Sequence, residues 1–147
     1  MRTLLAIALF ATACSGNGGA DILNADYAPF LNVDFDQSTL LPNGEFVRDF
    51  AIGTGAPVLQ GQTLSVNFNA WLPDGTVVGS SDLTGSSDFV LGDPGIIAGI
   101  NQGLGGMNVG GTRQLVIPPE LGYGDQGSGL VPGNAIIVYQ LAVIAAR

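Results

Sequence analysis

Glycine is the feature that most limits how this chain can fold. It occurs 23 times among the 147 residues, and proline occurs a further 8 times. Glycine weakens helices because it loses more conformational freedom on folding than other residues do, and proline interrupts them. We therefore expect short elements joined by many tight connections, and no long helix. The length gives room for one domain and hardly for two.

Charged and reactive residues are few, and their absence excludes several classes of function. The chain has 12 acidic residues and 4 arginines, with no lysine and no histidine, so its net charge is −8. Without histidine there is no Ser-His-Asp triad and no imidazole metal ligand, and without lysine there is no Walker lysine or Schiff base. An acidic chain without a basic stripe is also poorly suited to nucleic acid. We expect a function that needs no cofactor, no metal and no nucleic acid.

The N-terminus is typical of an exported protein. Arg2 precedes a short apolar run, residues 4–10, which is too short to span a bilayer, and small residues follow it. The single cysteine, Cys14, comes directly after them and resembles the lipobox of bacterial lipoproteins, in which the thiol takes a diacylglyceryl group. Ala11 stands where that pattern usually has leucine. Plain secretion with cleavage after Ala13 and a free structural cysteine are the alternatives.

We expect three parts along the chain. Residues 1–13 are interpreted as a signal peptide, residues 14–42 as a lipid-anchor linker with an acidic arm, and residues 43–147 as the folded domain. The arm is only sparsely apolar, so we expect an extended segment that packs partly on the domain. Diacylation together with an acylated amine would anchor the chain stably in a lipid bilayer, at the cell envelope of a bacterium.

From residue 43 onward the sequence predicts β-strands separated by turns. Residues 63–71 alternate between apolar and polar side chains, which indicates a strand with one buried face. A return strand is expected to begin near residue 77. The remaining strands are expected at residues 45–52, 89–91, 112–117 and 135–144.

One helix is expected, over residues 95–104. Apolar residues recur there at helical spacing, and Asp93 and Pro94 just ahead of them are typical start signals. Gly99 and Gly103 each lower the stability of a helix by ~1 kcal/mol relative to alanine. This helix must therefore depend on packing rather than on intrinsic propensity.

Several motifs from residue 72 onward keep a fixed order and spacing. They are residues 72–76 (LPDGT), 89–92 (FVLG), 96–100 (IIAGI), 103–111 (GLGGMNVGG), 113–124 (RQLVIPPELGYG) and 131–135 (VPGNA). This array resembles the FKBP-type peptidyl-prolyl cis/trans isomerases, the macrolide-binding immunophilins. The resemblance covers about residues 43–147.

The resemblance implies an α+β fold, in which a twisted antiparallel sheet of five to six strands wraps around one short helix. It implies an enzyme that rotates X-Pro bonds, with proline-containing polypeptides and macrolide inhibitors as ligands. Together with the export signal, this predicts exported proteins as its substrates. By position, the Tyr123 hydroxyl and the Ile97 backbone N–H would bind substrate carbonyls, and Phe68 would complete the catalytic group. The apolar pocket around the proline ring would also contain Phe89, Ile96, Ile100, Val131 and Tyr139.

Three places depart from the family pattern. Phe68 stands where tyrosine is usual, Val78 and Gly79 where Phe-Asp is usual, and Ser87 where another aromatic residue is usual. The polar wall of the pocket is therefore eroded, while its floor and Tyr123 remain. The alternatives to an active isomerase are a chaperone-like module that binds proline-containing or apolar segments with little turnover, and a purely structural envelope lipoprotein.

Overall fold

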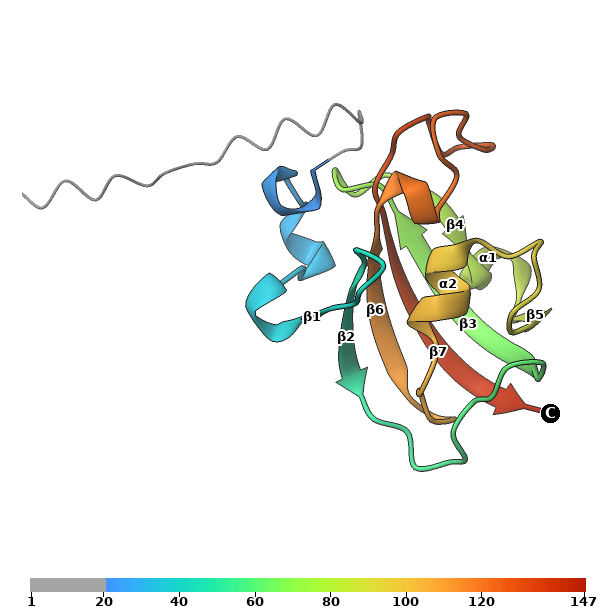
Figure 1. Cartoon of the computed structure of the whole chain (residues 1–147). Coiled ribbons are helices and arrows are strands. Elements are labelled where there is room, and N and C mark those ends of the chain that lie inside the picture. Colours follow the sequence, from blue (N-terminus) through green and yellow to red (C-terminus); the bar gives the residue numbers. More distant parts are fainter. Residues whose placement is uncertain (1–20) are drawn as a thin grey trace, which may run out of the picture.

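The computed structural model describes residues 21–147, with the backbone alone for residues 83 and 84. The predicted signal peptide and Cys14 lie outside the described residues. The strands form one antiparallel sheet in the order β1-β2-β6-β7-β3-β4, and β5 pairs with the first half of β3. This sheet curves around the short helix α2 (Ala98–Gly103), which confirms the predicted architecture (Figure 1). Within residues 21–147 the sheet has seven strands rather than the predicted five to six. The strands are β1 (Thr39–Leu40), β2 (Phe46–Ala51), β3 (Thr63–Trp71), β4 (Val77–Ser80), β5 (Ser87–Val90), β6 (Thr112–Ile117) and β7 (Ile137–Ala146).

Strand β3 follows its alternating sequence. Leu64, Val66 and Ala70 are buried, whereas Asn67 between them is exposed. The buried side chains face α2 and join the main core together with Leu115 of β6. The predicted bounds of β3 and β6 are both confirmed.

Other elements differ from the prediction at their ends. Strand β5 begins two residues earlier than expected because Ser87 pairs with Val66 of β3. Strand β7 was expected over residues 135–144, but it starts later, after Asn134 in a left-handed conformation, and continues to Ala146. A helical turn that the sequence analysis did not predict, α1 (Ser81–Thr84), begins where the Ser80 hydroxyl accepts a hydrogen bond from the Asp82 amide.

Helix α2 lies directly on β6. A Cβ atom on Gly99 would be 2.6 Å from the Ile117 side chain, and one on Gly103 would be 2.7 Å from the Leu115 side chain. Only glycine permits this approach, so packing holds the helix in place, as expected from the sequence. The helix is shorter than the predicted residues 95–104 because the preceding residues form a turn.

The arm covers the face of the sheet opposite α2. The prediction of an extended segment is wrong, because residues 21–38 contain three 3-10 helices: η1 (Ile22–Asn24), η2 (Pro29–Leu31) and η3 (Phe35–Gln37). Their apolar side chains form a second core with Val116 and Ile136, so the arm gains buried contacts that an extended chain would leave exposed. The Gln114 side-chain amide of β6 donates to the Leu31 carbonyl oxygen at 2.6 Å.

The arm also reaches the hairpin between β3 and β4. The Phe30 ring meets the Trp71 ring edge to face, with 6.3 Å between the ring centroids. Beside them the Ala28 amide donates to the Pro73 carbonyl oxygen at 2.7 Å. The arm and the hairpin are therefore joined by both an aromatic contact and a backbone hydrogen bond.

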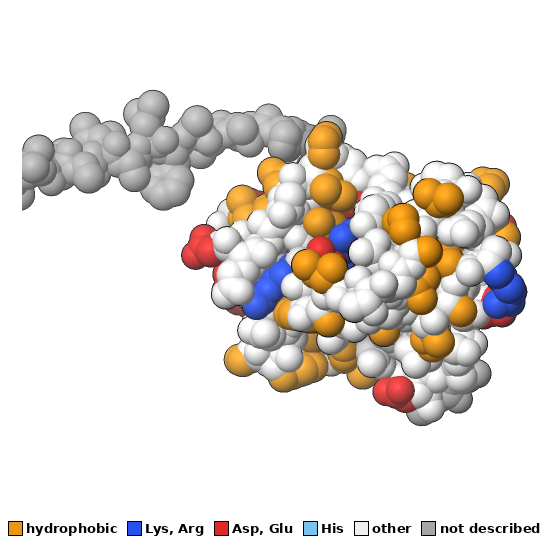
Figure 2. All heavy atoms as spheres, turned by 90° about the horizontal axis from the view of Figure 1, so that it is seen from below, with side chains coloured by type: hydrophobic (Ala, Val, Ile, Leu, Met, Phe, Trp, Pro, Cys, Tyr) orange, Lys and Arg blue, Asp and Glu red, His pale blue; other side chains and the backbone are white. Residues whose placement is uncertain are grey.

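Uncharged atoms dominate the surface. Figure 2 shows one face with few charged side chains and scattered hydrophobic ones. Within the described residues two ion pairs are formed, Arg113 with Asp49 at 2.7 Å and Arg147 with Asp88 at 2.8 Å. Over residues 21–147, no helix combines the length and apolar character needed to cross a membrane, and no three His, Cys, Asp or Glu side chains are grouped as metal ligands.

Candidate active site

A small apolar pocket lies between α2 and strands β3, β5 and β7. Its volume is about 210 Å³, well above the ~30 Å³ that one water molecule occupies in the liquid. The pocket is lined by Val66, Phe68, Ser87, Asp88, Phe89, Ile96, Ile100, Tyr139 and Leu141. Five of these residues are ones that the sequence analysis assigned to the site. The sheet and the start of α2 thus bring them together from four separate segments.

Strand register places the aromatic side chains. On β3 the alternation that buries Val66 also directs Phe68 to the same face, and on β5 Phe89 pairs with Leu64. Tyr139 comes from β7, and its ring centroid lies 6.1 Å from that of Phe68, with 40° between the ring planes. The Phe68 amide donates to the buried Ser81 hydroxyl at 2.9 Å, which ties this part of β3 to α1.

The Tyr139 phenol is held in its neutral form. Burial raises its pKa above the ordinary value, and the neighbouring Tyr123 raises it further. The Tyr139 hydroxyl therefore lies within reach of Tyr123, and it keeps its proton at any physiological pH.

The one acidic side chain at the pocket is already engaged. Asp88 accepts a hydrogen bond from the Ser65 hydroxyl and pairs with Arg147 at 2.8 Å. The hydrogen bond from Ser65 lowers the pKa of Asp88 most, and the bond from Arg147 lowers it further. The pocket therefore offers apolar contact and ring faces, and its carboxylate is turned to partners on the surface.

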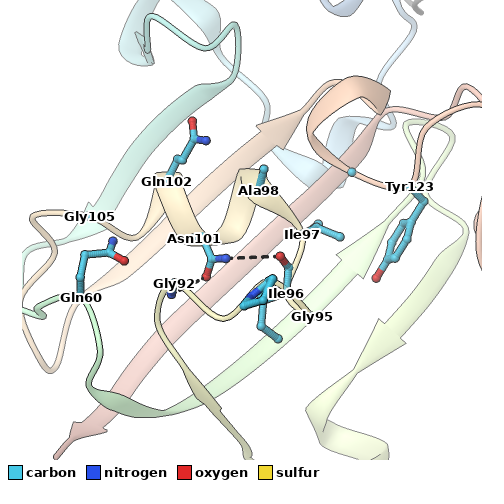
Figure 3. A pocket seen from close by; sticks show the side chains of 12 residues that line it. Gln60, Gly92, Gly95, Ile96, Ile97, Ala98, Asn101, Gln102, Gly105 and Tyr123 are labelled. Carbon is cyan, nitrogen blue, oxygen red and sulfur yellow. Dashed lines mark hydrogen bonds between the residues drawn. The ribbon is translucent and has the colours of Figure 1, made fainter.

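A larger hollow adjoins the pocket and holds the two expected hydrogen-bond donors. Its volume is about 810 Å³, and Ile96 lines both cavities. Ile97 and Tyr123 lie at one end of it, on the same side of α2 (Figure 3). The Ile97 N–H, directly ahead of the helix, has no acceptor among the described residues. It is thus a free donor in the same hollow as Tyr123.

Tyr123 is positioned by the turn that carries it. Helix η4 (Pro119–Leu121) precedes it, and the Gly124 amide closes the turn by donating to the Pro119 carbonyl oxygen at 2.8 Å. Val131, also assigned to the site from the sequence, is 7% exposed and belongs to the main core with Tyr139. It lies behind the pocket and is absent from the residues that line it in the described part of the chain.

Asn101 fixes the loop that leads into α2, and the sequence analysis did not single it out. Its Oδ1 accepts from the Gly92 amide at 2.9 Å, and its Nδ2 donates to the Ile96 carbonyl oxygen at 3.3 Å (Figure 3). The same Nδ2 donates to the Asp93 carbonyl oxygen at 2.9 Å. The Asp93 carboxylate in turn accepts from the Gly95 amide at 2.7 Å. These bonds hold Ile96 and Ile97 in place; only Asp93, noted as a helix start signal, gave a hint of them.

Comparisons with known proteins agree with this geometry. Residues 55–144 match the family described as FKBP-type peptidyl-prolyl cis-trans isomerase. The FK506-binding protein of Neisseria meningitidis serogroup B is 34% identical over 103 residues, which are 69% of this chain and 94% of that protein. The crystal structure of FkpA from Escherichia coli matches with a TM-score of 0.71 and 28% identity, over 81% of this chain and 55% of that one. A peptidyl-prolyl cis-trans isomerase from Pseudomonas syringae pv. tomato matches with a TM-score of 0.69 and 28% identity, over 76% and 81% of the two chains.

Proposed function

The chain belongs to the FKBP-type peptidyl-prolyl cis-trans isomerase family, and on that premise we propose that the apolar pocket is where it holds a substrate proline during catalysis. The observation that carries this proposal is the convergence of Phe68, Phe89, Ile96, Ile100 and Tyr139 on one cavity. Burying a proline ring against such side chains contributes ~1.5–3 kcal/mol of binding free energy.

The chemistry fits a site without strong nucleophiles. Rotation about an X-Pro bond must cross a barrier of ~18–20 kcal/mol, because amide resonance is lost at the perpendicular geometry. No covalent bond is made or broken. The twisted amide is less polar than the planar one, so an apolar pocket favours it over the ground state, and only such a difference lowers the barrier.

Two donors are proposed to orient the substrate. The Tyr123 hydroxyl and the free Ile97 N–H lie at the same end of the larger hollow, next to the pocket through Ile96. Bonds from both to substrate carbonyls would fix the chain on each side of the rotating bond. Because these donors stand on a turn and a loop held by backbone and Asn101 hydrogen bonds, they need little reorganisation on binding.

An isomerisation assay tests the proposal. A proline-centred tetrapeptide is enriched in its cis form, and its relaxation to trans is followed with and without the protein. We expect acceleration that a macrolide inhibitor suppresses. If neither the inhibitor nor substitutions of the pocket residues altered the acceleration, the assignment of this pocket would be contradicted.

A binding module with little turnover is the second candidate. It is favoured by the rim, where Gly79 brings no side chain and Phe68 brings no hydroxyl. A protein that binds the tetrapeptide without accelerating its isomerisation would support this candidate.

We also propose that the protein is an exported lipoprotein that acts on exported polypeptides. Arg2, the apolar residues 4–10 and the lone Cys14 support this proposal. The chain enters the described structure at the arm, which covers the sheet face opposite α2. An anchor at Cys14 would therefore leave the pocket open to substrates.

A further inference from the structure

The larger hollow continues well beyond the two catalytic donors. It curves around α2 from Tyr123 and Ile97 to Gln60 and Gly105 at the other end (Figure 3). We call the part beyond Ile97, lined by Gln60, Gly92, Asn101, Gln102 and Gly105, the α2 groove. Ile96 joins it to the apolar pocket, so a ligand seated in the pocket can extend into the α2 groove without a break.

The hollow is electrically neutral. None of the residues that line it carries a charge, although the whole chain has a net charge of −8. Nearly half of its lining residues are very small, so main-chain groups reach its surface; these are Gly92, Gly95, Ala98, Gly105 and Gly122. A charged ligand would find no counter-ion here, whereas an uncharged polypeptide segment could lie close to the floor.

Two side-chain amides in the α2 groove have donor or acceptor atoms without a partner among the described residues. Gln60 is exposed and forms no hydrogen bond within residues 21–147. Gln102 accepts a bond from Asn43 with its Oε1, while its Nε2 has no partner among the described residues. A primary amide both donates and accepts, as a peptide group does, so it can pair with a main chain of any sequence. The Asn101 side chain, in contrast, already makes three hydrogen bonds within the protein and forms a fixed part of the groove wall.

We propose that the α2 groove binds the extended substrate segment that flanks the proline, through main-chain hydrogen bonds to Gln60 and Gln102. Helix α2 has six residues and is therefore ~9 Å long. An extended chain advances ~3.3 Å per residue, so the groove accommodates about three residues beyond the pocket. This inference rests on the proposed function, and it assigns uncharged, extended segments as the preferred surroundings of the substrate proline.

Substrate length provides the test. The full chain is assayed with a proline-centred tetrapeptide and with the same peptide lengthened by six uncharged residues on either side in turn. In Gln60→Ala we expect kcat/KM to fall about 2- to 10-fold for one of the long peptides, as for the loss of one hydrogen bond, and to stay unchanged for the tetrapeptide. Gly105→Trp should show the same pattern by filling the groove, because a Cβ atom there meets only the Gln102 carbonyl oxygen, at 3.4 Å.

A matched variant controls for the loss of an amide elsewhere. Gln37→Ala removes an exposed glutamine from the arm, on the opposite face of the sheet, and should leave both substrates unaffected. Equal losses on short and long peptides, or no loss on any long peptide, would overturn the proposal.

Affinity provides a second readout that does not need turnover. The Kd of each long peptide is measured by calorimetry with the wild type, Gln60→Ala and Gln37→Ala. If the wild type leaves the tetrapeptide unaccelerated, the proposed function fails, yet weaker binding by Gln60→Ala alone would still support the groove. Equal affinities of all three proteins would refute it.

Discussion

Gly79 of β4 faces Phe68 of β3, and a Cβ atom on Gly79 would lie 3.2 Å from Cε2 of the Phe68 ring. The backbone of Gly79 is outside the left-handed region, so a side chain is compatible with its conformation. A small shift of the ring edge would make room for one. The fold can therefore accommodate an acidic side chain at this position of the pocket rim.

Restoring the family residues should raise activity. In Gly79→Asp combined with Val78→Phe, the new carboxylate would stand at the edge of the Phe68 ring and return a polar acceptor to the rim. We expect kcat/KM on the tetrapeptide to rise about tenfold or more, since a hydrogen bond to a charged group contributes ~1.5–3 kcal/mol. Val78→Phe alone is the control. A folded double variant with unchanged turnover would show that the rim does not contribute to catalysis.

Removing the Tyr123 hydroxyl should lower turnover and leave the fold intact. One neutral hydrogen bond is worth ~0.5–1.5 kcal/mol, so Tyr123→Phe is expected to reduce kcat/KM by up to about tenfold. Tyr27→Phe is a matched control, because its hydroxyl donates to the Ile22 carbonyl oxygen at 2.8 Å in the arm. That variant should lose stability and keep its activity. Equal turnover of Tyr123→Phe and wild type would remove Tyr123 from the site.

The glycines of α2 should resist substitution even by a better helix former. In Gly99→Ala the new Cβ would meet Ile117 Cγ2 at 2.6 Å, and overpacking of this kind typically costs ~1–3 kcal/mol. Alanine gains ~1 kcal/mol of helix propensity, so we expect a net loss in the free energy of unfolding. Gly105→Ala, whose Cβ has room, should change it by less than ~0.5 kcal/mol. Urea denaturation distinguishes the two; equal stability of both variants would contradict the close packing of α2 on β6.

Buried Glu45 makes stability depend on pH. Burial raises its pKa to about 7, against smaller lowering effects of the Asn43 hydrogen bond and the Arg113 charge. Its Oε2 has no hydrogen-bond partner among the described residues. The folded state therefore keeps a proton that the unfolded chain releases near pH 4.5, and stability falls as pH rises from there to about 7. The loss is expected to reach a few kcal/mol.

Glu45→Gln should flatten this part of the pH profile. The amide keeps the shape of the side chain but cannot ionise, so its advantage over the wild type should grow between pH 5 and pH 8. The free energy of unfolding at these two values gives the measurement. Glu120→Gln, at an exposed position, should retain the wild-type profile. Parallel profiles for Glu45→Gln and wild type would refute a buried, protonated Glu45.

Replacing Cys14 should abolish lipid attachment. Serine lacks the thiol that accepts the diacylglyceryl group, so Cys14→Ser should carry no acyl chains. It should be either soluble after cleavage at Ala13 or uncleaved and membrane-bound through residues 4–10. Mass spectrometry of the N-terminus distinguishes these forms. A free thiol on Cys14 of the mature wild type would reject the lipoprotein proposal and leave export possible.

Glycine spacing explains why much of the sheet could be predicted. The longest glycine-free runs after residue 44 are residues 62–74, 112–121 and 134–147, and they contain β3, β6 and β7. The arm could not be predicted in the same way. Its 3-10 helices are stabilised by Gln114, Val116 and Ile136, which are far away in the sequence.

The residues of the candidate site likewise differ in whether the sequence could reveal them. The apolar pocket follows from residues whose type and order resemble a family, and Phe68, Phe89 and Ile100 indeed line one cavity. Gln60 and Asn101 gave no such signal. Their amides matter because of what the fold places beside them, and single polar residues in turns and short helices have no periodicity to reveal this.

The contact between Phe30 and Trp71 determines which structural change the intrinsic tryptophan fluorescence of this protein detects. Trp71 is the only tryptophan, and it lies at the junction of the arm and the hairpin, while the pocket floor has Ile100. Intrinsic tryptophan fluorescence will therefore respond to release of the arm from the hairpin. Ligand binding in the pocket will change that fluorescence very little, so ligand titrations need a labelled peptide. The indole signal then reports only on how the arm packs against the hairpin.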